Sequence, residues 1–283
     1  MLPAITASRN GSAVAIASRD PNRAKELASR HSIAKVLSDY DALLADPEVD
    51  AVYIPLPNNL HRGWTLRALA AGKHVLCEKP IGMNSEEAEE MAASAAASGL
   101  CLMEAFMYRF HPRTRTFVEG LRGADPPLHV RASFGFTLTD ANNYRMRREL
   151  GGGALLDVGC YAVNIARWIL GEPESVAAEA RVDASTGVDM SVSALLRFPS
   201  GATASLWCSF EAAEEQGLTA ITRTAASSLE QPFSAWRDPD DPYQLMVESF
   251  ADTVMGGGSV ATPVEDSIAN MRVLDRIREA ARF

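Results

Sequence analysis

Two charged residues, Glu78 and Lys79, stand together at the end of an apolar run and directly before Pro80, in the stretch CEKP. Burying a charged group is unfavourable unless the group is paired or used, so such a pair at the end of a buried strand indicates a functional cleft. A cis bond before Pro80 would sharpen the turn that points Lys79 into that cleft. The alternative is an ordinary salt bridge at the end of a strand.

A carboxylate and a phenol, Asp157 and Tyr161, follow a run of glycines at 151–153. Their i, i+4 spacing puts both side chains on one face of a helix. The glycines allow another backbone or a ligand to come close to the start of that helix. Converging on a cleft, the two groups suit the binding of a hydroxylated substrate and the transfer of a proton. The alternative is a core tyrosine hydrogen-bonded to an aspartate.

The end of another predicted strand carries Ser18 and Arg19, and Asp20 follows them. In a dinucleotide-binding sheet, an acidic residue at this point accepts hydrogen bonds from the ribose of NAD, whereas a guanidinium suits the 2′-phosphate of NADP. Because Ser18 and Arg19 come first, the sequence favours NADP, with NAD as the other possible cofactor. Without a ligand, the same residues would form a solvated turn.

Polar residues also follow the apolar run that ends in PLPNNLH, in the position where ligands of parallel sheets bind. Asn58, Asn59 and His61 can contact a ribose or a nicotinamide there, with Pro57 beside them. Each of the three can equally cap the helix that follows, and capping is the expected role of Asn58 taken alone.

The elements that must position these residues follow two patterns. Up to residue 106, β-rich runs alternate with helical runs, which predicts a Rossmann-type parallel sheet with right-handed crossovers. The strand candidates there are 13–17, 49–57, 73–80 and 100–106, and the helix candidates are 20–31, 38–47, 61–72 and 84–99.

After residue 106, long strand candidates follow one another with little helix between them, which predicts an open, mainly antiparallel sheet. These candidates are 128–136, 175–184, 188–199, 202–212 and 217–224, with a helix at 154–171 and two terminal helices at 241–257 and 264–282. We therefore expect a Rossmann-like domain at 1–106, an antiparallel-sheet domain for substrate and oligomerisation at 107–242, and C-terminal helices at 243–283 that pack back on both.

Composition excludes several classes of protein. The net charge of -9 argues against nucleic-acid binding. No apolar run approaches about 18 residues, so no membrane span is expected, and the N-terminus lacks the pattern of a signal peptide. The cysteines are far apart and the histidines do not cluster, so we expect no metal site, no disulfide framework, and reduced thiols in the cytoplasm.

Taken together, four stretches resemble the glucose–fructose oxidoreductase, inositol dehydrogenase and rhizopine-catabolism (Gfo/Idh/MocA) family in order and spacing. They are VYIPLPNNLH, AGKHVLCEKP, LMEAFMYRFHP and GGGALLDVGCYAVNIARWILGEP. The resemblance is closest to the branch of sugar 1-dehydrogenases and dimeric dihydrodiol dehydrogenases, which carry tyrosine where many relatives carry histidine. It implies a Rossmann domain followed by an open antiparallel sheet that often pairs subunits.

The resemblance also implies roles for single residues. Lys79 matches the catalytic lysine of the E-K-P motif, Asp157 the acid that orients the substrate, and Tyr161 the proton donor or acceptor. The residues expected to bind the cofactor are Ser18, Arg19, Pro57, Asn59, His61, Glu78, Lys79, Pro80 and Arg109. The implied reaction is hydride transfer between NADP(H), or NAD(H), and a carbinol carbon of a sugar, polyol or dihydrodiol, in a cytoplasmic homodimer or homotetramer. Tyr108, Arg109 and His111 are expected at the hinge between the domains.

The sequence departs from the family pattern at its start, where a first strand and a glycine-rich loop are expected before LPAITAS. The one G-x-G-x-x-[GA] match, GGGSVA at 256–261, follows a helix, so we interpret it as a helix-ending turn. Without the first strand, each unpaired buried group of its neighbours costs about 1–3 kcal/mol. We therefore expect a start at an internal methionine or a gene remnant. The alternative function is a non-catalytic remnant or binding module that no longer holds a dinucleotide.

Overall fold

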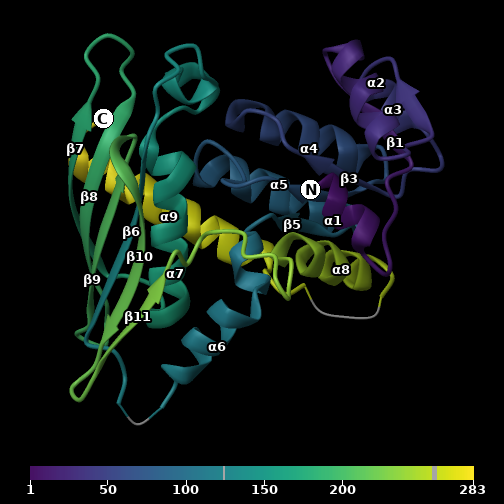
Figure 1. Ribbon diagram of the computed structural model, residues 1–283. Coiled ribbons are helices and arrows are strands. Elements are labelled where there is room, and N and C mark those ends of the chain that lie inside the picture. The colour runs from purple at the N-terminus through teal and green to yellow at the C-terminus, as the bar shows by residue number, and fades with distance from the viewer. Residues whose placement is uncertain (124, 257–259) are drawn as a thin grey trace.

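Short parallel strands alternate with helices in the first part of the chain, as the sequence pattern predicts. The structure is a computed structural model that describes residues 1–123, 125–256 and 260–283 (Figure 1). β1 (Ala15–Ala17) pairs in parallel with β2 (Lys35–Leu37), a short strand that the sequence analysis does not anticipate. β3 (Ala51–Ile54), β4 (His74–Cys77) and β5 (Leu102–Glu104) form a separate parallel sheet in that order.

Side-chain and glycine caps bound two helices of this part. The Asp20 carboxylate accepts hydrogen bonds from backbone N–H groups in the first turn of α2 (Pro21–Arg30), and the Asn84 side chain caps α5 (Ser85–Ser98) in the same way. Gly99 ends α5 in the left-handed conformation, with φ +67°. The other helices of this part are α1 (Leu2–Ala7), α3 (Tyr40–Ala45) and α4 (His61–Ala70).

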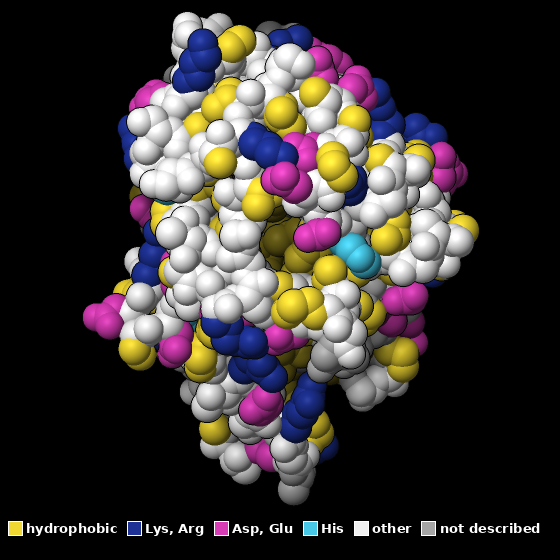
Figure 2. Space-filling model, turned by 90° about the vertical axis from the view of Figure 1, so that its right-hand side faces the viewer, with side chains coloured by type: hydrophobic (Ala, Val, Ile, Leu, Met, Phe, Trp, Pro, Cys, Tyr) yellow, Lys and Arg dark blue, Asp and Glu magenta, His cyan; other side chains and the backbone are white. Residues whose placement is uncertain are grey.

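The parallel sheet is divided into two pieces, because β1 and β3 do not pair with each other among the described residues. The interruption lies where a doubly wound strand order places the first strand. Figure 2 looks at the side of the molecule on which β1 and α2 lie, and it shows a hollow with hydrophobic side chains at its base.

The second sheet has six strands. They are β6 (His129–Thr137), β7 (Ser175–Val182), β8 (Asp189–Arg197), β9 (Thr203–Ser209), β10 (Glu211–Ile221) and β11 (Ala226–Glu230). Their order is β11-β10-β6-β9-β8-β7, and every neighbouring pair is antiparallel except β6 and β9, which are parallel. The chain returns from β6 to β9 through α7 (Cys160–Leu170), β7 and β8, and this long connection allows the parallel pair. The sheet is thus mixed and mainly antiparallel, which confirms the predicted fold class.

One face of this sheet is covered and the other is open. α7 packs on β6 and β9, and side chains of β8 alternate between the two faces. Leu196 is 0% exposed and its neighbour Leu195 is 51% exposed. On the open face, β8 thus presents Leu195 between the polar side chains of Ser193 and Arg197.

The C-terminal helices connect the two sheets (Figure 1). α8 (Pro242–Val254) contacts α1 and the 3-10 turn η2 (Met107–Phe110), whereas α9 (Val264–Ala281) contacts α5, α7 and β7. A further helix, α6 (Pro112–Gly120), follows η2 and is not anticipated by the sequence analysis. Gly256, with φ +79°, follows α8 as expected for a helix-ending turn, while 257–259 of GGGSVA lie outside the described residues.

Within residues 1–123, 125–256 and 260–283, one helical segment, Arg148–Leu170, is long and apolar enough to cross a membrane by length and composition alone. Within its most apolar window, 83% of the residues are buried inside the protein. Burial of this extent is typical of a core helix.

Candidate functional site

Lys79 lies in the turn that follows β4 and reaches across to the second domain. The Lys79–Pro80 bond is cis. The Lys79 ammonium Nζ donates hydrogen bonds to the backbone oxygen of Asp157 at 2.6 Å and to its Oδ1 at 3.1 Å. Two groups that are 78 residues apart in sequence therefore meet.

The helix that carries Asp157 begins with a π-helical turn, η5 (Leu155–Gly159), which α7 then continues. Such turns occur frequently at functional sites. Glycine is required just before it, because Gly153 has φ +120° and a Cβ there would lie 1.9 Å from Asp189 Oδ1. The Asp189 carboxylate accepts a hydrogen bond from the backbone N–H of Leu155 at 2.7 Å, and burial raises its pKa to about 6. The glycine thus makes room for a carboxylate that caps the helix.

Asp157 is held between two cations. Its Oδ1 contacts Lys79, and its Oδ2 accepts a hydrogen bond from Nε of Arg145 at 2.6 Å. Burial raises the pKa of Asp157, but Lys79 and Arg145 together lower it below its ordinary value. Burial lowers the pKa of Lys79, but nearby acidic groups, Asp157 first among them, raise it well above its ordinary value. All three groups are therefore charged at neutral pH.

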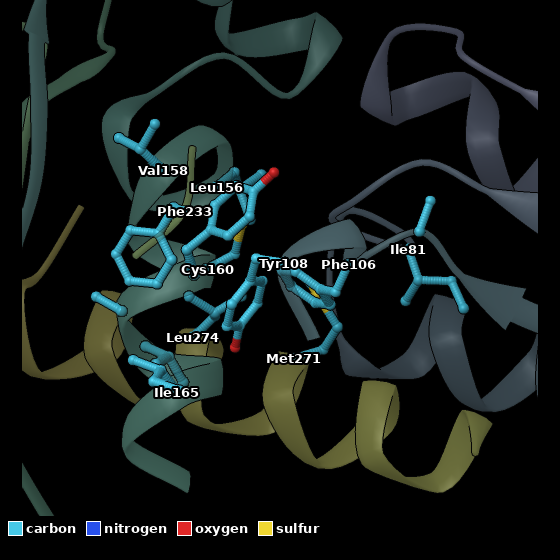
Figure 3. Packing of buried hydrophobic residues seen from close by; sticks show 14 of the residues in the cluster. Ile81, Phe106, Tyr108, Leu156, Val158, Cys160, Ile165, Phe233, Met271 and Leu274 are labelled. Carbon is cyan, nitrogen blue, oxygen red and sulfur yellow. The ribbon is translucent and has the colours of Figure 1, made fainter. Parts of the chain in front are cut away.

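Tyr161 lies on the same side of the helix and beside the lysine. The Lys79 Nζ lies 5.0 Å from the centroid of the Tyr161 ring. That ring packs against Phe106 and Phe233, each with a centroid distance of 5.3 Å, and both are seen near the start of α7 together with Tyr108 in Figure 3. Burial raises the pKa of Tyr161 well above its ordinary value, although Lys79 acts to lower it. The tyrosine is therefore a neutral acid at physiological pH.

Glu78 lies on the other side of Lys79 in the same turn. The Tyr53 hydroxyl donates a hydrogen bond to Glu78 Oε1 at 2.6 Å, and burial is the main reason why the pKa of Tyr53 is raised. Burial is also the main reason why the pKa values of two further tyrosines, Tyr144 and Tyr243, are raised. The Glu78 carboxylate acts in the same direction on both. The Tyr53 phenol therefore anchors Glu78 in this turn.

His61, Asn58 and Asn59 follow β3 and differ in their hydrogen-bond partners. Both ring nitrogens of the fully buried His61 lie 2.8 Å from backbone oxygens, Nδ1 from Pro80 and Nε2 from Leu56. Asn58 Nδ2 donates a hydrogen bond to the backbone oxygen of Gly151 at 2.8 Å, so it links β3 to the glycine run instead of capping α4. The remaining amide, Asn59, has a buried Oδ1 without a hydrogen-bond partner among the described residues.

The predicted residues at the end of β1 lie in a more exposed setting. Ser18 Oγ accepts a hydrogen bond from the Asp20 N–H at 3.1 Å. Arg19 is exposed, and Pro57 precedes the 3-10 turn η1 (Asn58–Leu60) at the end of β3. Ser18 and Arg19 therefore occupy the carboxyl end of β1, as the sequence predicts.

The predicted hinge residues contact three different helices, α7, α9 and α6. The Arg109 guanidinium forms an ion pair with Asp266 and lies 4.7 Å from the centroid of the Trp168 ring. The Tyr108 hydroxyl donates a hydrogen bond to Asn164 Oδ1 at 2.5 Å. His111 caps α6 through its ring nitrogen. Arg109 is thus already paired with α9.

Sequence reasoning missed Arg145, Tyr53 and Glu104, which the fold brings to the site. Arg145 follows two asparagines and a tyrosine in a polar loop, where a solvated charge is the ordinary expectation. Tyr53 lies inside an apolar strand pattern. Glu104, at the end of β5, offered the clearest signal, because it is another carboxylate at the end of an apolar run.

The arrangement combines a neutral phenol, Tyr161, with a fixed cation, Lys79, and a carboxylate, Asp157, that holds the cation in place. Such a set can exchange a proton with an oxygen atom of a small molecule and orient a second hydroxyl. Among the described residues, no group of His, Cys, Asp and Glu side chains could hold a metal ion.

Two protein-family models match the chain. The model described as "Oxidoreductase family, NAD-binding Rossmann fold" matches residues 1–106, and the model described as "GFO/IDH/MocA C-terminal domain" matches residues 126–227. These matches agree with the family resemblance of the sequence motifs and with the oxidoreductase class.

Several known proteins are similar over most of the chain. The D-xylose 1-dehydrogenase (NADP(+)) 2 of Haloferax volcanii is 39% identical, over 99% of this chain and 93% of its own. The mouse trans-1,2-dihydrobenzene-1,2-diol dehydrogenase is 43% identical, over 69% of this chain and 60% of its own. The crystal structure of KijD10, a 3-ketoreductase from Actinomadura kijaniata, with NADP and TDP-benzene has a TM-score of 0.86 at 32% identity, covering 99% of this chain and 92% of its own.

Proposed function

Because the chain belongs to the Gfo/Idh/MocA oxidoreductase family, we propose that it transfers a hydride between NADP(H) and a CH–OH carbon of a sugar, a polyol or a dihydrodiol. The observation that carries the proposal is the contact of Lys79 with Asp157, beside the ring of Tyr161. The relatives named for a D-xylose dehydrogenase (NADP(+)) and a dihydrodiol dehydrogenase support this substrate class, as does the 3-ketoreductase structure that contains NADP.

The residues at the ends of β1, β3 and β4 fit a nicotinamide dinucleotide. Arg19, exposed beside Ser18, suits a 2′-phosphate and therefore favours NADP over NAD. The buried amide oxygen of Asn59 accepts no hydrogen bond from the part of the chain that the structure describes, which suits a donor on the cofactor. Pro57, Glu78 and Pro80 would lie against the cofactor, while His61 and Arg109 would support that surface through the contacts described above.

The bound nicotinamide supplies or accepts the hydride. In the direction of reduction, Tyr161 donates its hydroxyl proton to the carbonyl oxygen of the substrate, and its raised pKa keeps this proton available at neutral pH. In the direction of oxidation, Tyr161 must accept a proton, and the Lys79 ammonium favours the phenolate that does so. Asp157 keeps Lys79 charged and oriented, and it binds a second hydroxyl of the substrate.

The proposal includes the domain boundaries, the pairing of subunits and the cellular compartment of the protein. The boundaries at 1–106, 107–242 and 243–283 separate cofactor binding, the substrate and oligomerisation sheet, and the helices that join them. The open face of the second sheet, which exposes Leu195, would pair subunits in a homodimer or homotetramer. The described cysteines are all free, which agrees with a cytoplasmic protein.

Titration with NADPH, followed by fluorescence, and turnover of a panel of sugars, polyols and dihydrodiols test the proposal. We expect binding in the micromolar range and loss of turnover in Lys79→Met. Lys73→Met is the matched control, because Lys73 is also buried and begins the same strand region, but its Nζ donates to Asp46. A cooperatively folded protein that binds no NADPH would refute the enzyme and support the non-catalytic binding module instead.

A further inference from the structure

The peptide group that follows Lys79–Pro80 is held at both ends by buried side chains. Its carbonyl oxygen, on Pro80, lies 2.8 Å from His61 Nδ1, which comes from α4. Its N–H, on Ile81, donates a hydrogen bond of 2.8 Å to Glu104 Oε1, at the end of β5. Side chains from two different elements therefore fix the plane of one peptide.

This peptide is close enough in sequence to control the lysine. The proline ring fixes the φ angle of Pro80, so ψ of Pro80 is the one free backbone rotation between the Lys79–Pro80 bond and the held peptide. Fixing the plane of that peptide at both ends restricts this rotation as well. Lys79 in turn makes two hydrogen bonds to Asp157, at 2.6 and 3.1 Å. A change in the orientation of the Pro80–Ile81 peptide would therefore move the ammonium away from these partners.

The buried position of the Glu104 carboxyl is unfavourable for the stability of the fold. It is 1% exposed, and its Oε2 has no hydrogen-bond partner among the described residues. Burial raises the pKa of the Glu104 carboxyl to about 7, with Ser267, the Ile81 N–H and Arg109 acting to lower it and Asp266 to raise it. A half-satisfied buried carboxyl is unfavourable for folding, so its presence beside the turn needs another reason.

We propose that Glu104 is a positioning residue for the hydride-transfer reaction: through the Ile81 N–H it orients the Pro80–Ile81 peptide, and this peptide holds Lys79 against Asp157 and Tyr161. This inference rests on the proposed function only where the test measures kcat. The orientation of the turn can be followed without any substrate.

The test compares Glu104→Gln with Glu104→Leu. The glutamine retains an oxygen acceptor for the Ile81 N–H, whereas the leucine does not. We expect kcat within about 3-fold of the parent in Glu104→Gln and at least about 10-fold lower in Glu104→Leu, since a small misplacement of a reacting group is enough for such a loss. The Kd for NADPH should change by less than about 3-fold in both.

Stability and hydrogen exchange separate positioning from a structural role. At pH 8 the leucine variant should unfold at the same denaturant concentration as the parent or a higher one, because the buried carboxylate is gone. Amide exchange in a peptide that covers 77–84 should become faster in Glu104→Leu and stay unchanged in Glu104→Gln. The control is Met103→Leu, which replaces another buried side chain of β5. It should change neither the stability of the protein nor the amide exchange rate at 77–84.

Two results would overturn the proposal. One is an unchanged exchange rate at 77–84 in Glu104→Leu, and the other is a loss of kcat that is matched by a loss of stability. If the parent protein turns over no CH–OH substrate, the proposed function fails, but faster exchange at 77–84 in Glu104→Leu alone would still show that Glu104 holds the turn.

Discussion

Replacing Asp157 by Asn removes the carboxylate that Lys79 and Arg145 share. The side chains of Lys79 and Asp157 are only 14% and 9% exposed, so the lysine would remain buried without an anion. Breaking a buried ion pair in this way costs about 3–5 kcal/mol of the free energy of unfolding. The Arg145 side chain is 29% exposed and can turn toward solvent, so most of this cost belongs to the lysine.

Replacing Lys79 by Met has a different consequence. Asp157 keeps its hydrogen bond from Arg145 at 2.6 Å and loses only charged hydrogen bonds from the lysine, which contribute about 1.5–3 kcal/mol. The double variant has neither the carboxylate nor the buried ammonium, so it should be more stable than Asp157→Asn alone. The interaction free energy of the double-mutant cycle should therefore exceed about 1 kcal/mol.

Denaturant unfolding of the four proteins at pH 7 measures this cycle. The pair Lys35–Asp46, at 2.7 Å but more open to solvent, is the control and should show a smaller interaction free energy. Effects of the two substitutions that add within about 0.5 kcal/mol would contradict the reasoning. So would a Lys79→Met protein that is as unstable as Asp157→Asn.

Three further predictions concern groups around the same helix. Gly153→Ala should lower the free energy of unfolding by more than about 1 kcal/mol, because φ is +120° and the new Cβ meets Asp189; a Tm equal to that of the parent would contradict it. The pKa of Asp189 is about 6 in the folded chain against an ordinary 3.8, so the folded state binds more protons and stability should fall by about 2 kcal/mol as pH rises from 4 to 7. In Asp189→Asn the decrease in stability that the Asp189 carboxyl causes should be absent. If urea unfolding of both proteins shows the same dependence on pH, the raised pKa of Asp189 is refuted. Arg145→Leu should lower kcat/KM for the substrate while leaving the Kd for NADPH unchanged, and a parallel loss of both in kinetic and binding assays would place Arg145 at the cofactor instead.

The sequence by itself predicted most of the helices and strands, although not β2 or α6, and it singled out Glu78, Lys79, Asp157 and Tyr161. The predicted helices 20–31 and 84–99 lie within one residue of α2 and α5 at each end, since the apolar pattern and N-terminal residues such as Asp20 and Asn84 act within a few residues. The charged pair Glu78 and Lys79 stood out for a similar reason, because a charge at the end of an apolar run is unusual wherever the chain folds.

Other features depended on contacts between distant parts of the chain. Nothing local in a polar loop indicates that Arg145 pairs with Asp157, and nothing in PLPNNLH indicates that both nitrogens of His61 lie on backbone oxygens. The parallel pairing of β6 with β9 and the division of the parallel sheet are likewise matters of topology.

The sequence thus determined which groups can carry out proton chemistry, because their type and local spacing are written in the chain. Only the tertiary structure decided which of them share a charge or a hydrogen bond. A lysine at position 79 and a carboxylate at position 157 have no energetic relation until the turn after β4 and the helix start at η5 bring them to 3.1 Å.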